Sequence, residues 1–222
     1  MTKNRLTILT YLICLFFIAP LMAQEVATTI FDETKVGTYT LPSALIKAEG
    51  RKAIALPGDL RDEKFCKKLV DDAAKALGGL DILVNNAARQ QANESILDIS
   101  SEEFDWTMKT NIYALFWITK AALAYLKPGS SIIATTSVQA TDPSADLFDY
   151  AQTKAANTSY VRSLAKQLGP KGIRVNGVAP GPIWTPSQVS ITGKFKEIWV
   201  KNTIRKTRTT SRTCRHICLA CR

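Results

Sequence analysis

The sequence predicts an α/β fold built on an incomplete, doubly wound parallel sheet. Between residues 52 and 180, short apolar runs alternate with longer segments whose apolar side chains recur every three or four residues. Such alternation is typical of strands that are joined by helices into a parallel sheet. The chain has 222 residues, 46% hydrophobic and 22% charged, which favours one compact domain over a disordered or multispan membrane protein.

Four strands and three helices are expected to alternate along the chain. The strands are KAIALPGD, DILVNNA, SIIATTS and IRVNGVAP, at residues 52–59, 81–87, 131–137 and 173–180. The helices span residues 61–77 and 101–126, and a third begins at Asp146 or Asp149 and ends at Leu168. Gly78, Pro128 and Gly169 follow these helices, where glycine and proline commonly end helical structure.

The two ends of the chain differ in composition from this central part. Residues 1–23 combine Lys3 and Arg5 with an uncharged apolar run, which predicts a cleaved signal peptide. A retained membrane anchor and a buried segment of the fold are the alternatives. Residues 24–42 stay unassigned, residues 43–188 form the predicted domain, and residues 189–222 form a basic, irregular tail.

The net charge of +10 does not indicate a nucleic-acid-binding protein. Residues 194–222 carry nine Lys or Arg and one Glu, so they account for +8 of it and leave the rest of the chain nearly neutral. A dedicated DNA or RNA reader displays a basic face on its folded domain. We therefore expect no nucleic-acid partner, and contact with a membrane through the N-terminal segment alone.

The tail also holds the chain's one group of metal-ligating residue types. Cys214, His216, Cys218 and Cys221 have spacings that zinc or an iron–sulfur cluster can use. No further domain follows them to enclose such a group, so free thiols are the preferred interpretation and no metal is expected.

Tyr150 and Lys154 are candidate catalytic residues. They lie four residues apart on a predicted helix, so their side chains share one face and the ammonium can lower the pKa of the phenol toward the range of a general base. The alternative is a surface tyrosine beside a solvated lysine. Ser137 ends a predicted strand at the edge where parallel sheets bind ligands. Asn111 interrupts a predicted helix, where it can bend a turn or face solvent.

Taken in order, these residues resemble the short-chain dehydrogenase/reductase family. The resemblance rests on NNAA at 85–88, Asn111, Ser137, YAQTK at 150–154 and APGPIWT at 179–185, and it covers residues 43–188. EGRKAIALPGDLRDE, DILVNNAA and TTSVQA are most similar to bacterial proteins of the glucose/ribitol dehydrogenase-like, general-stress group. The resemblance implies a Rossmann-like fold and NAD or NADP as the cofactor. It also implies hydride transfer to or from an alcohol or carbonyl of a sugar-like or polyol substrate.

The same resemblance implies roles for individual residues. Tyr150 would be the catalytic acid/base, Lys154 would lower its pKa and bind the nicotinamide ribose, Ser137 would orient the substrate oxygen, and Asn111 would hold a water in a proton relay. The residues implied to contact the cofactor are Asp59 at the adenine, Asn86 and Ala87 at the adenosine ribose, and Pro180, Gly181, Ile183 and Thr185 at the nicotinamide. Asn85 is expected to brace neighbouring strands.

One part of the family pattern is missing from this sequence. The family opens with a strand and a G-x-x-x-G-x-G turn that binds the pyrophosphate, but no glycine precedes Gly37, and Gly37 and Gly50 are isolated. The sequence therefore predicts an incomplete sheet and a chain that lacks activity despite its active-site motifs. An exported or membrane-anchored, non-catalytic interaction protein is the alternative. A cytoplasmic or exported location, and a monomer or homo-oligomer, are both left open.

Overall fold

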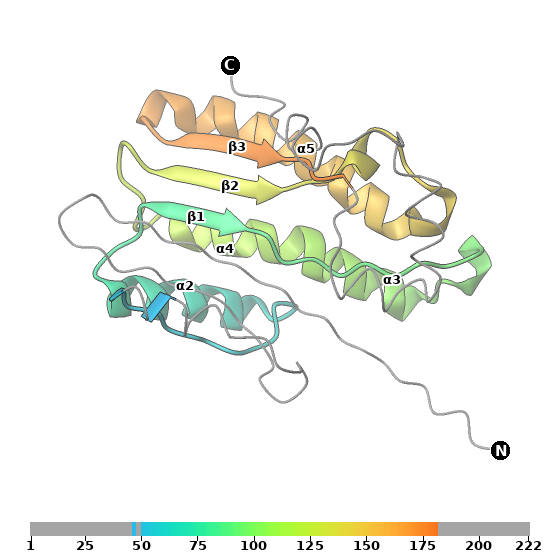
Figure 1. The fold of residues 1–222 in the computed structure, drawn as a ribbon, viewed down its shortest axis with the longest axis horizontal. Coiled ribbons are helices and arrows are strands. Elements are labelled where there is room, and N and C mark those ends of the chain that lie inside the picture. Colours follow the sequence, from blue (N-terminus) through green and yellow to red (C-terminus); the bar gives the residue numbers. More distant parts are fainter. Residues whose placement is uncertain (1–45, 48–49, 182–222) are drawn as a thin grey trace.

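Parallel strands form the centre of the computed structural model, which describes residues 46–47 and 50–181 (Figure 1). Within these residues the strands are β1 (Ile82–Asn85), β2 (Ser131–Thr135) and β3 (Arg174–Val178), and their order in the sheet is β1-β2-β3. Leu83 lies opposite Ile132, and Ile132 lies opposite Val175. The predicted α/β class with a parallel sheet is confirmed.

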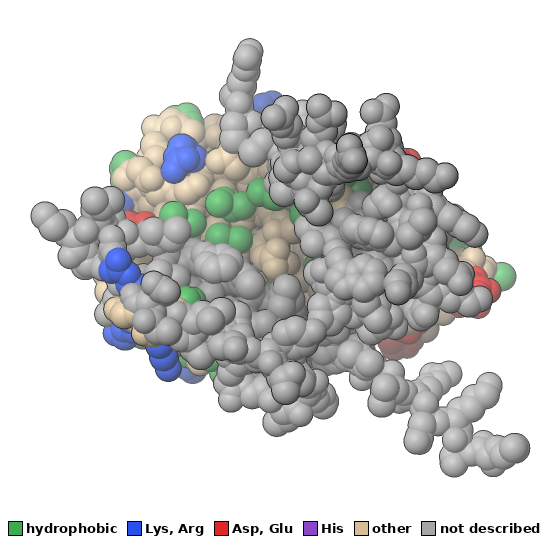
Figure 2. Space-filling view, in the orientation of Figure 1, with side chains coloured by type: hydrophobic (Ala, Val, Ile, Leu, Met, Phe, Trp, Pro, Cys, Tyr) green, Lys and Arg blue, Asp and Glu red, His purple; other side chains and the backbone are tan. Residues whose placement is uncertain are grey.

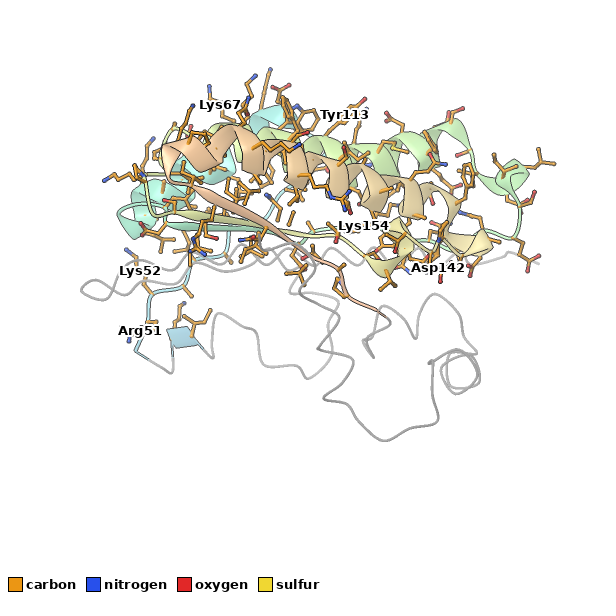
Figure 3. All side chains as sticks on the ribbon, turned by 90° about the horizontal axis from the view of Figure 1, so that it is seen from above. Arg51, Lys52, Lys67, Tyr113, Asp142 and Lys154 are labelled. Atoms are coloured by element: carbon orange, nitrogen blue, oxygen red, sulfur yellow. The ribbon has the colours of Figure 1, made fainter. Side chains whose placement is uncertain are left out.

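The helices of the described residues lie on one face of this sheet. They are α2 (Glu63–Leu77), α3 (Ser101–Met108), α4 (Ala114–Ala122) and α5 (Phe148–Leu168). Figures 1 and 3 show them as a layer on one side of the strands, and α2 packs against α4. The short helical turns are η1 (Ile96–Asp98), η2 (Lys109–Tyr113), η3 (Val138–Ala140), η4 (Ala145–Leu147) and η5 (Gly169–Lys171).

The core lies between these two layers. Leu83 of β1 and Ile132 of β2 are almost fully buried, and Val70, Ile118 and Leu168 cover them from three helices. Burial of such side chains is the main contribution to stability at about 25 cal/mol per Å² of apolar surface. The buried residues of α2 recur at three- and four-residue steps, such as Leu69, Ala73 and Leu77, as the helical periodicity of the sequence predicts.

The ends of α2 follow the signals in the sequence. The side chain of Asp62 accepts a hydrogen bond from the backbone N–H of Lys64 at 2.9 Å, which satisfies one of the free donors of the first turn. Gly78 follows the helix with φ of 81°, in the left-handed conformation that glycine adopts without a steric cost.

The expected helix 101–126 is not continuous. A π-helical turn, η2, separates α3 from α4, and it contains Asn111. Asn111 thus lies where the regular helix is interrupted, and the interpretation of a solvent-facing asparagine is wrong because its side chain is buried. An extra residue in the turn rotates α4 relative to α3, as π-bulges commonly do at functional sites.

The expected strand 52–59 does not form. Lys52 makes an isolated bridge, and residues 53–59 have no regular secondary structure, since a strand needs an extended hydrogen-bonded neighbour.

In Figure 2, hydrophobic side chains are visible near the middle of the face opposite the helices.

The predictions for the two ends of the chain lie outside the described residues. They concern the signal peptide at residues 1–23, the unassigned residues 24–42 and the tail from residue 189, with its cysteines and histidine. Within residues 46–47 and 50–181, no helix has the length and apolarity that crossing a membrane requires. The same residues contain no cluster of His, Cys, Asp or Glu suited to a metal ion.

Candidate functional site

The candidate site lies at the carboxyl ends of the strands. Parallel strands bring these ends to one edge of a sheet, so the residues that follow β2 and β3 meet there. The backbone N–H of Thr136 donates to Val178 O at 2.7 Å, and that of Val138 donates to Pro180 O at 3.1 Å. These bonds hold Ser137, which lies between the two donors, beside the segment that leaves β3.

Lys154 is buried between α5 and the sheet. Its side chain is 2% exposed, and its Nζ donates a hydrogen bond to the backbone oxygen of Thr135 at 2.7 Å. Figure 3 shows Lys154 on the sheet side of the helices, whereas Tyr113 points away from it. Burial lowers the pKa of Lys154 to about 8, because a low dielectric disfavours the ammonium form. The interpretation of Lys154 as a solvated surface lysine is therefore wrong.

Tyr150 lies beside both Lys154 and Ser137. The Nζ of Lys154 is 5.4 Å from the centroid of the Tyr150 ring, as expected for residues four apart on α5. Burial raises the pKa of the Tyr150 phenol, and a hydrogen bond with Ser137 opposes part of this rise. Lys154 was expected to lower this pKa, but its charge is not among the causes of the shift, and its Nζ binds the Thr135 carbonyl. The net direction of the Tyr150 pKa is therefore upward in this structure, and the role of Lys154 toward the phenol stays a prediction.

Ser137 begins the turn η3 at the end of β2. Its side-chain oxygen accepts a hydrogen bond from the backbone N–H of Gln139 at 3.2 Å, which fixes the hydroxyl at the start of the turn. The side chain is 8% exposed. Ser137 and Tyr150 are thirteen residues apart in the sequence, and the fold brings Ser137 close enough to lower the pKa of the Tyr150 phenol in part.

Asn111 joins the loop after β1 to α5. Its Oδ1 accepts from Arg89 N at 2.7 Å, and its Nδ2 donates to Arg89 O at 2.9 Å and to Thr153 Oγ1 at 3.0 Å. The backbone oxygen of Asn111 accepts from Asn157 Nδ2 at 3.1 Å. The side chain of Asn111 thus binds protein groups, and its role in holding a water of a proton relay stays a prediction.

Asn86 and Ala87 line a cleft beside β1. The cleft measures about 340 Å³ with its open part included, and Thr110 and Leu60 also line it. Thr110 Oγ1 is buried and has no hydrogen-bond partner among the described residues. A buried hydroxyl without a partner costs free energy, so it favours a polar occupant of this cleft.

The two adjacent asparagines brace different elements. Asn86 Oδ1 accepts from Thr135 Oγ1 of β2 at 2.7 Å, and Asn86 also lines the cleft. Asn85 Nδ2 donates to Thr119 Oγ1 of α4 at 3.1 Å. The prediction that Asn85 braces neighbouring strands is therefore wrong, because it ties its strand to a helix and Asn86 makes the contact between strands.

Of the remaining residues predicted to bind the cofactor, three lie within the part of the chain that the structure describes. Asp59 forms an ion pair with Arg61 at 2.6 Å, and hydrogen bonds from that guanidinium lower the pKa of the Asp59 carboxyl. Pro180 and Gly181 lie next to Val138. Ile183 and Thr185 lie outside the described residues.

Sequence reasoning missed four polar residues that surround Tyr150. They are Arg89, Thr107, Asp149 and Thr153, and apart from Arg89 all are nearly inaccessible to solvent. A weak signal was present, because Thr107 and Asn111 are spaced by four residues, as are Asp149 and Thr153. Two helices with polar residues at this spacing can face each other, but a single sequence does not show which faces meet.

Comparisons with known proteins identify relatives of similar sequence. A family model described as enoyl-(acyl carrier protein) reductase matches residues 17–220. General stress protein 39 of Bacillus subtilis is 51% identical over 141 residues, which are 64% of this chain and 49% of that protein. Glucose and ribitol dehydrogenase of Daucus carota is 45% identical over 186 residues, which are 81% of this chain and 63% of that protein.

A solved structure shares the same arrangement. The crystal structure of a short chain dehydrogenase from Burkholderia cenocepacia in complex with NADP has a TM-score of 0.69 and 35% sequence identity. The similarity covers 78% of this chain and 71% of that one. The chain spans about half the length of the curated relatives it matches with the highest identity.

Proposed function

The chain belongs to the short-chain dehydrogenase/reductase family, and on that premise we propose that it transfers hydride between a nicotinamide cofactor and the carbonyl or alcohol of a sugar-like or polyol substrate. The predicted family and its Rossmann-like fold are confirmed. The observation that carries the proposal is the convergence of Ser137, Tyr150 and Lys154 at the carboxyl edge of the sheet.

Tyr150 has the properties of the proton donor in such a reaction. Its raised pKa keeps the phenol protonated at neutral pH, which suits protonation of a substrate oxygen during carbonyl reduction. Ser137 contacts the phenol, so a substrate oxygen placed between the two hydroxyls would receive hydrogen bonds from both. In the reverse direction, the phenolate would accept the proton of the alcohol.

Lys154 fits the nicotinamide end of the cofactor. An ammonium has three N–H donors, and Thr135 O accepts one of them in the described structure. The others are free to bind ribose hydroxyls beside Tyr150. The bound cofactor would supply or accept the hydride. Asn86 and Ala87 would contact the adenosine ribose from the cleft that they line, and Pro180 and Gly181 would lie at the nicotinamide.

NADPH is the first cofactor to test, since the solved relative from Burkholderia cenocepacia is in complex with NADP. NAD remains the alternative. Neither the described residues nor the sequence before them contains a G-x-x-x-G-x-G turn, so the residues described fit the nicotinamide end better than the pyrophosphate. The missing turn favours a second candidate function, a non-catalytic interaction protein. Its exported or membrane-anchored location would rest on the apolar segment at residues 1–23.

Cofactor binding and turnover separate the two candidates. NADPH and NADH fluorescence titrations of the full chain would be followed by reduction assays on sugar aldehydes and polyol-derived ketones. We expect Tyr150→Phe to bind the cofactor with unchanged affinity and to lose about 10²- to 10⁴-fold in kcat. Tyr113→Phe is the matched control, because this tyrosine is exposed on the outer side of η2.

Two results would contradict the dehydrogenase. One is a folded wild-type chain, by circular dichroism, that binds neither nucleotide, which would favour the interaction protein. The other is equal turnover in wild type and Tyr150→Phe.

Fractionation of cells would test whether the protein is cytoplasmic or exported. Analytical sedimentation would test whether it forms a homo-oligomer.

A further inference from the structure

A buried polar cluster lies beneath the first turn of α5, directly before Tyr150. It consists of Arg89 from the loop after β1, Thr107 from α3 and Asp149 from α5. Asp149 is 1% exposed and Thr107 is fully buried. Charged side chains are almost never buried to this extent unless they are paired, so the buried carboxylate of Asp149 depends on its partners in the cluster.

The cluster joins α3 to α5 through the hydroxyl of Thr107. Thr107 Oγ1 lies 2.6 Å from Asp149 Oδ2 and accepts a hydrogen bond from Arg89 Nη1, also at 2.6 Å. The hydroxyl can therefore accept from the guanidinium and donate to the carboxylate at the same time. Arg89 Nη1 itself is 3.8 Å from Asp149 Oδ2, so charge attraction adds to this bridge.

A second bridge runs parallel to the first, one helical turn further along. Asn111 Nδ2 donates to Thr153 Oγ1, as described above. Residues four apart on a helix lie on one face, so Thr107 and Asn111 face Asp149 and Thr153. Two parallel bridges fix the rotation of α5 about its axis more firmly than one.

Both bridges reach the backbone of Tyr150. The N–H of Tyr150 donates to Asp149 Oδ1 at 2.8 Å, and the oxygen of Tyr150 accepts from Thr153 Oγ1 at 2.7 Å. The first turn of a helix has free N–H groups, and a carboxylate there is also favoured by the helix dipole. The two polar backbone groups of Tyr150 are thus each held by a side chain that is itself anchored to α3 or η2.

Arg89 closes the cluster from the side of β1. Its backbone is clamped by Asn111, and its guanidinium also contacts Gln91 and lies 5.1 Å from the centre of the Trp106 ring. Its Nη2 is 4.0 Å from Glu103 Oε1. These contacts restrict the movement of the guanidinium. Arg89 therefore links Thr107 and Asp149 to the loop after β1.

We propose that Asp149, Thr107 and Arg89 are positioning residues that hold Tyr150 in its reactive place beside Ser137 and Lys154. The proposal rests on the proposed dehydrogenase function, for which the place of the phenol decides the rate. A misplacement of about 1 Å can lower a rate about 100-fold, so loosening this turn should act on kcat.

Two substitutions at Thr107 separate the effect of its hydroxyl from the effect of side-chain size. Thr107→Val removes the bridge at nearly the same side-chain size, and Thr107→Ser restores it. Asp149→Asn keeps the side-chain size at the other end of the bridge and removes its charge, and it serves if Thr107→Val does not fold. Asp105→Asn is the control, because Asp105 is an exposed aspartate of α3 that pairs with Lys109.

Two readouts distinguish positioning from stabilisation of the fold. The first is kcat and KM in NADPH-dependent carbonyl reduction. The second needs no turnover: the ultraviolet titration of the Tyr150 phenol, obtained as the difference between each variant and the same variant with Tyr150→Phe. The ionisable groups around this phenol are Lys154, with Asp149 and Arg89 behind its backbone, and circular dichroism would monitor the fold during the titration.

We expect Thr107→Val to lower kcat about 10- to 100-fold with KM changed by less than about twofold. The phenol should then titrate closer to the ordinary value of about 10, because a looser turn admits water. Thr107→Ser and Asp105→Asn should retain most of the wild-type values. A loss of thermal stability with unchanged kcat and phenol titration would overturn the proposal, as would equal losses in Thr107→Val and Thr107→Ser.

The phenol titration also separates this proposal from the proposed function. If the wild-type chain shows no turnover with either nucleotide, the dehydrogenase fails, but the titration still reports on the place of Tyr150. A shift in Thr107→Val that Thr107→Ser reverses would then support positioning, and an unchanged titration would overturn it.

Discussion

At the scale of single residues, the buried lysine has the clearest physical consequence. Lys154 pairs with a neutral carbonyl rather than with a carboxylate, so burial of its charge is compensated only in part. This cost is the reason for its lowered pKa. The same ammonium lies beside Tyr150 at the candidate site.

This lysine makes stability depend on pH. Between the folded pKa of about 8 and the unfolded value of 10.5, the unfolded chain binds a proton that the folded chain has released. The free energy of unfolding therefore rises with pH in this window. We expect wild type to gain about 2 kcal/mol relative to Lys154→Met between pH 7 and pH 9.5.

Urea unfolding at several pH values measures this difference. Comparison with Lys154→Met cancels the titration of Cys66, whose pKa burial raises to about 12. Lys68→Met is the control, since Lys68 is an exposed lysine of α2 and its replacement leaves the buried ammonium of Lys154 in place. A flat difference between wild type and Lys154→Met would contradict the expected cost of burying this charge.

At the scale of elements, local sequence signals set the ends of the helices. Gly78 and Gly169 follow α2 and α5, and a Cβ added to either would meet no atom within 4 Å. Their backbones differ, however. Gly78 has a φ of 81°, which costs other residues about 1 kcal/mol, whereas Gly169 has a φ of −52°, which any residue adopts.

Substitutions of these two glycines test how much the backbone angle φ contributes to stability. We expect Gly78→Ala to lower the free energy of unfolding by about 1 kcal/mol and Gly169→Ala to leave it unchanged or raise it by about 0.5 kcal/mol. Thermal and urea unfolding would measure both changes. Equal effects of the two substitutions would show that φ does not decide the cost.

At the scale of the whole molecule, the middle strand joins the halves of the described fold. β2 pairs with β1 on one side and β3 on the other, and Ile132 is 1% exposed. The backbone amides of β2 become accessible to solvent only when the strands of the sheet separate, because β1 and β3 cover its two edges.

Hydrogen–deuterium exchange should reveal this order of stability. We expect a peptide that covers β2 to exchange most slowly, and one that covers η1, where Leu97 is 91% exposed, to exchange fast. Peptide-level mass spectrometry would measure both. Protection of β1 equal to that of β2 would contradict the ranking drawn from the described strands.

The sequence by itself determined the α/β class and the elements with a strong local signal. The helix predicted at residues 61–77 forms at Glu63–Leu77, because its apolar spacing and the glycine that follows it depend only on neighbours in the chain. The nearness of Tyr150 and Lys154 was predictable because residues four apart share a helix face, and the place of Ser137 because it ends a strand at the ligand-binding edge. Their catalytic roles, which the family resemblance implies, stay predictions.

The tertiary structure decided what depends on contacts between distant segments. KAIALPGD is apolar enough for a strand, but pairing and not composition makes a strand, and residues 53–59 stay irregular. The pKa of Tyr150 rises because packing removes water from the phenol. The pairing of Asp149 with Thr107 and Arg89 depends on how α3 and α5 face each other, and no local pattern encodes that rotation.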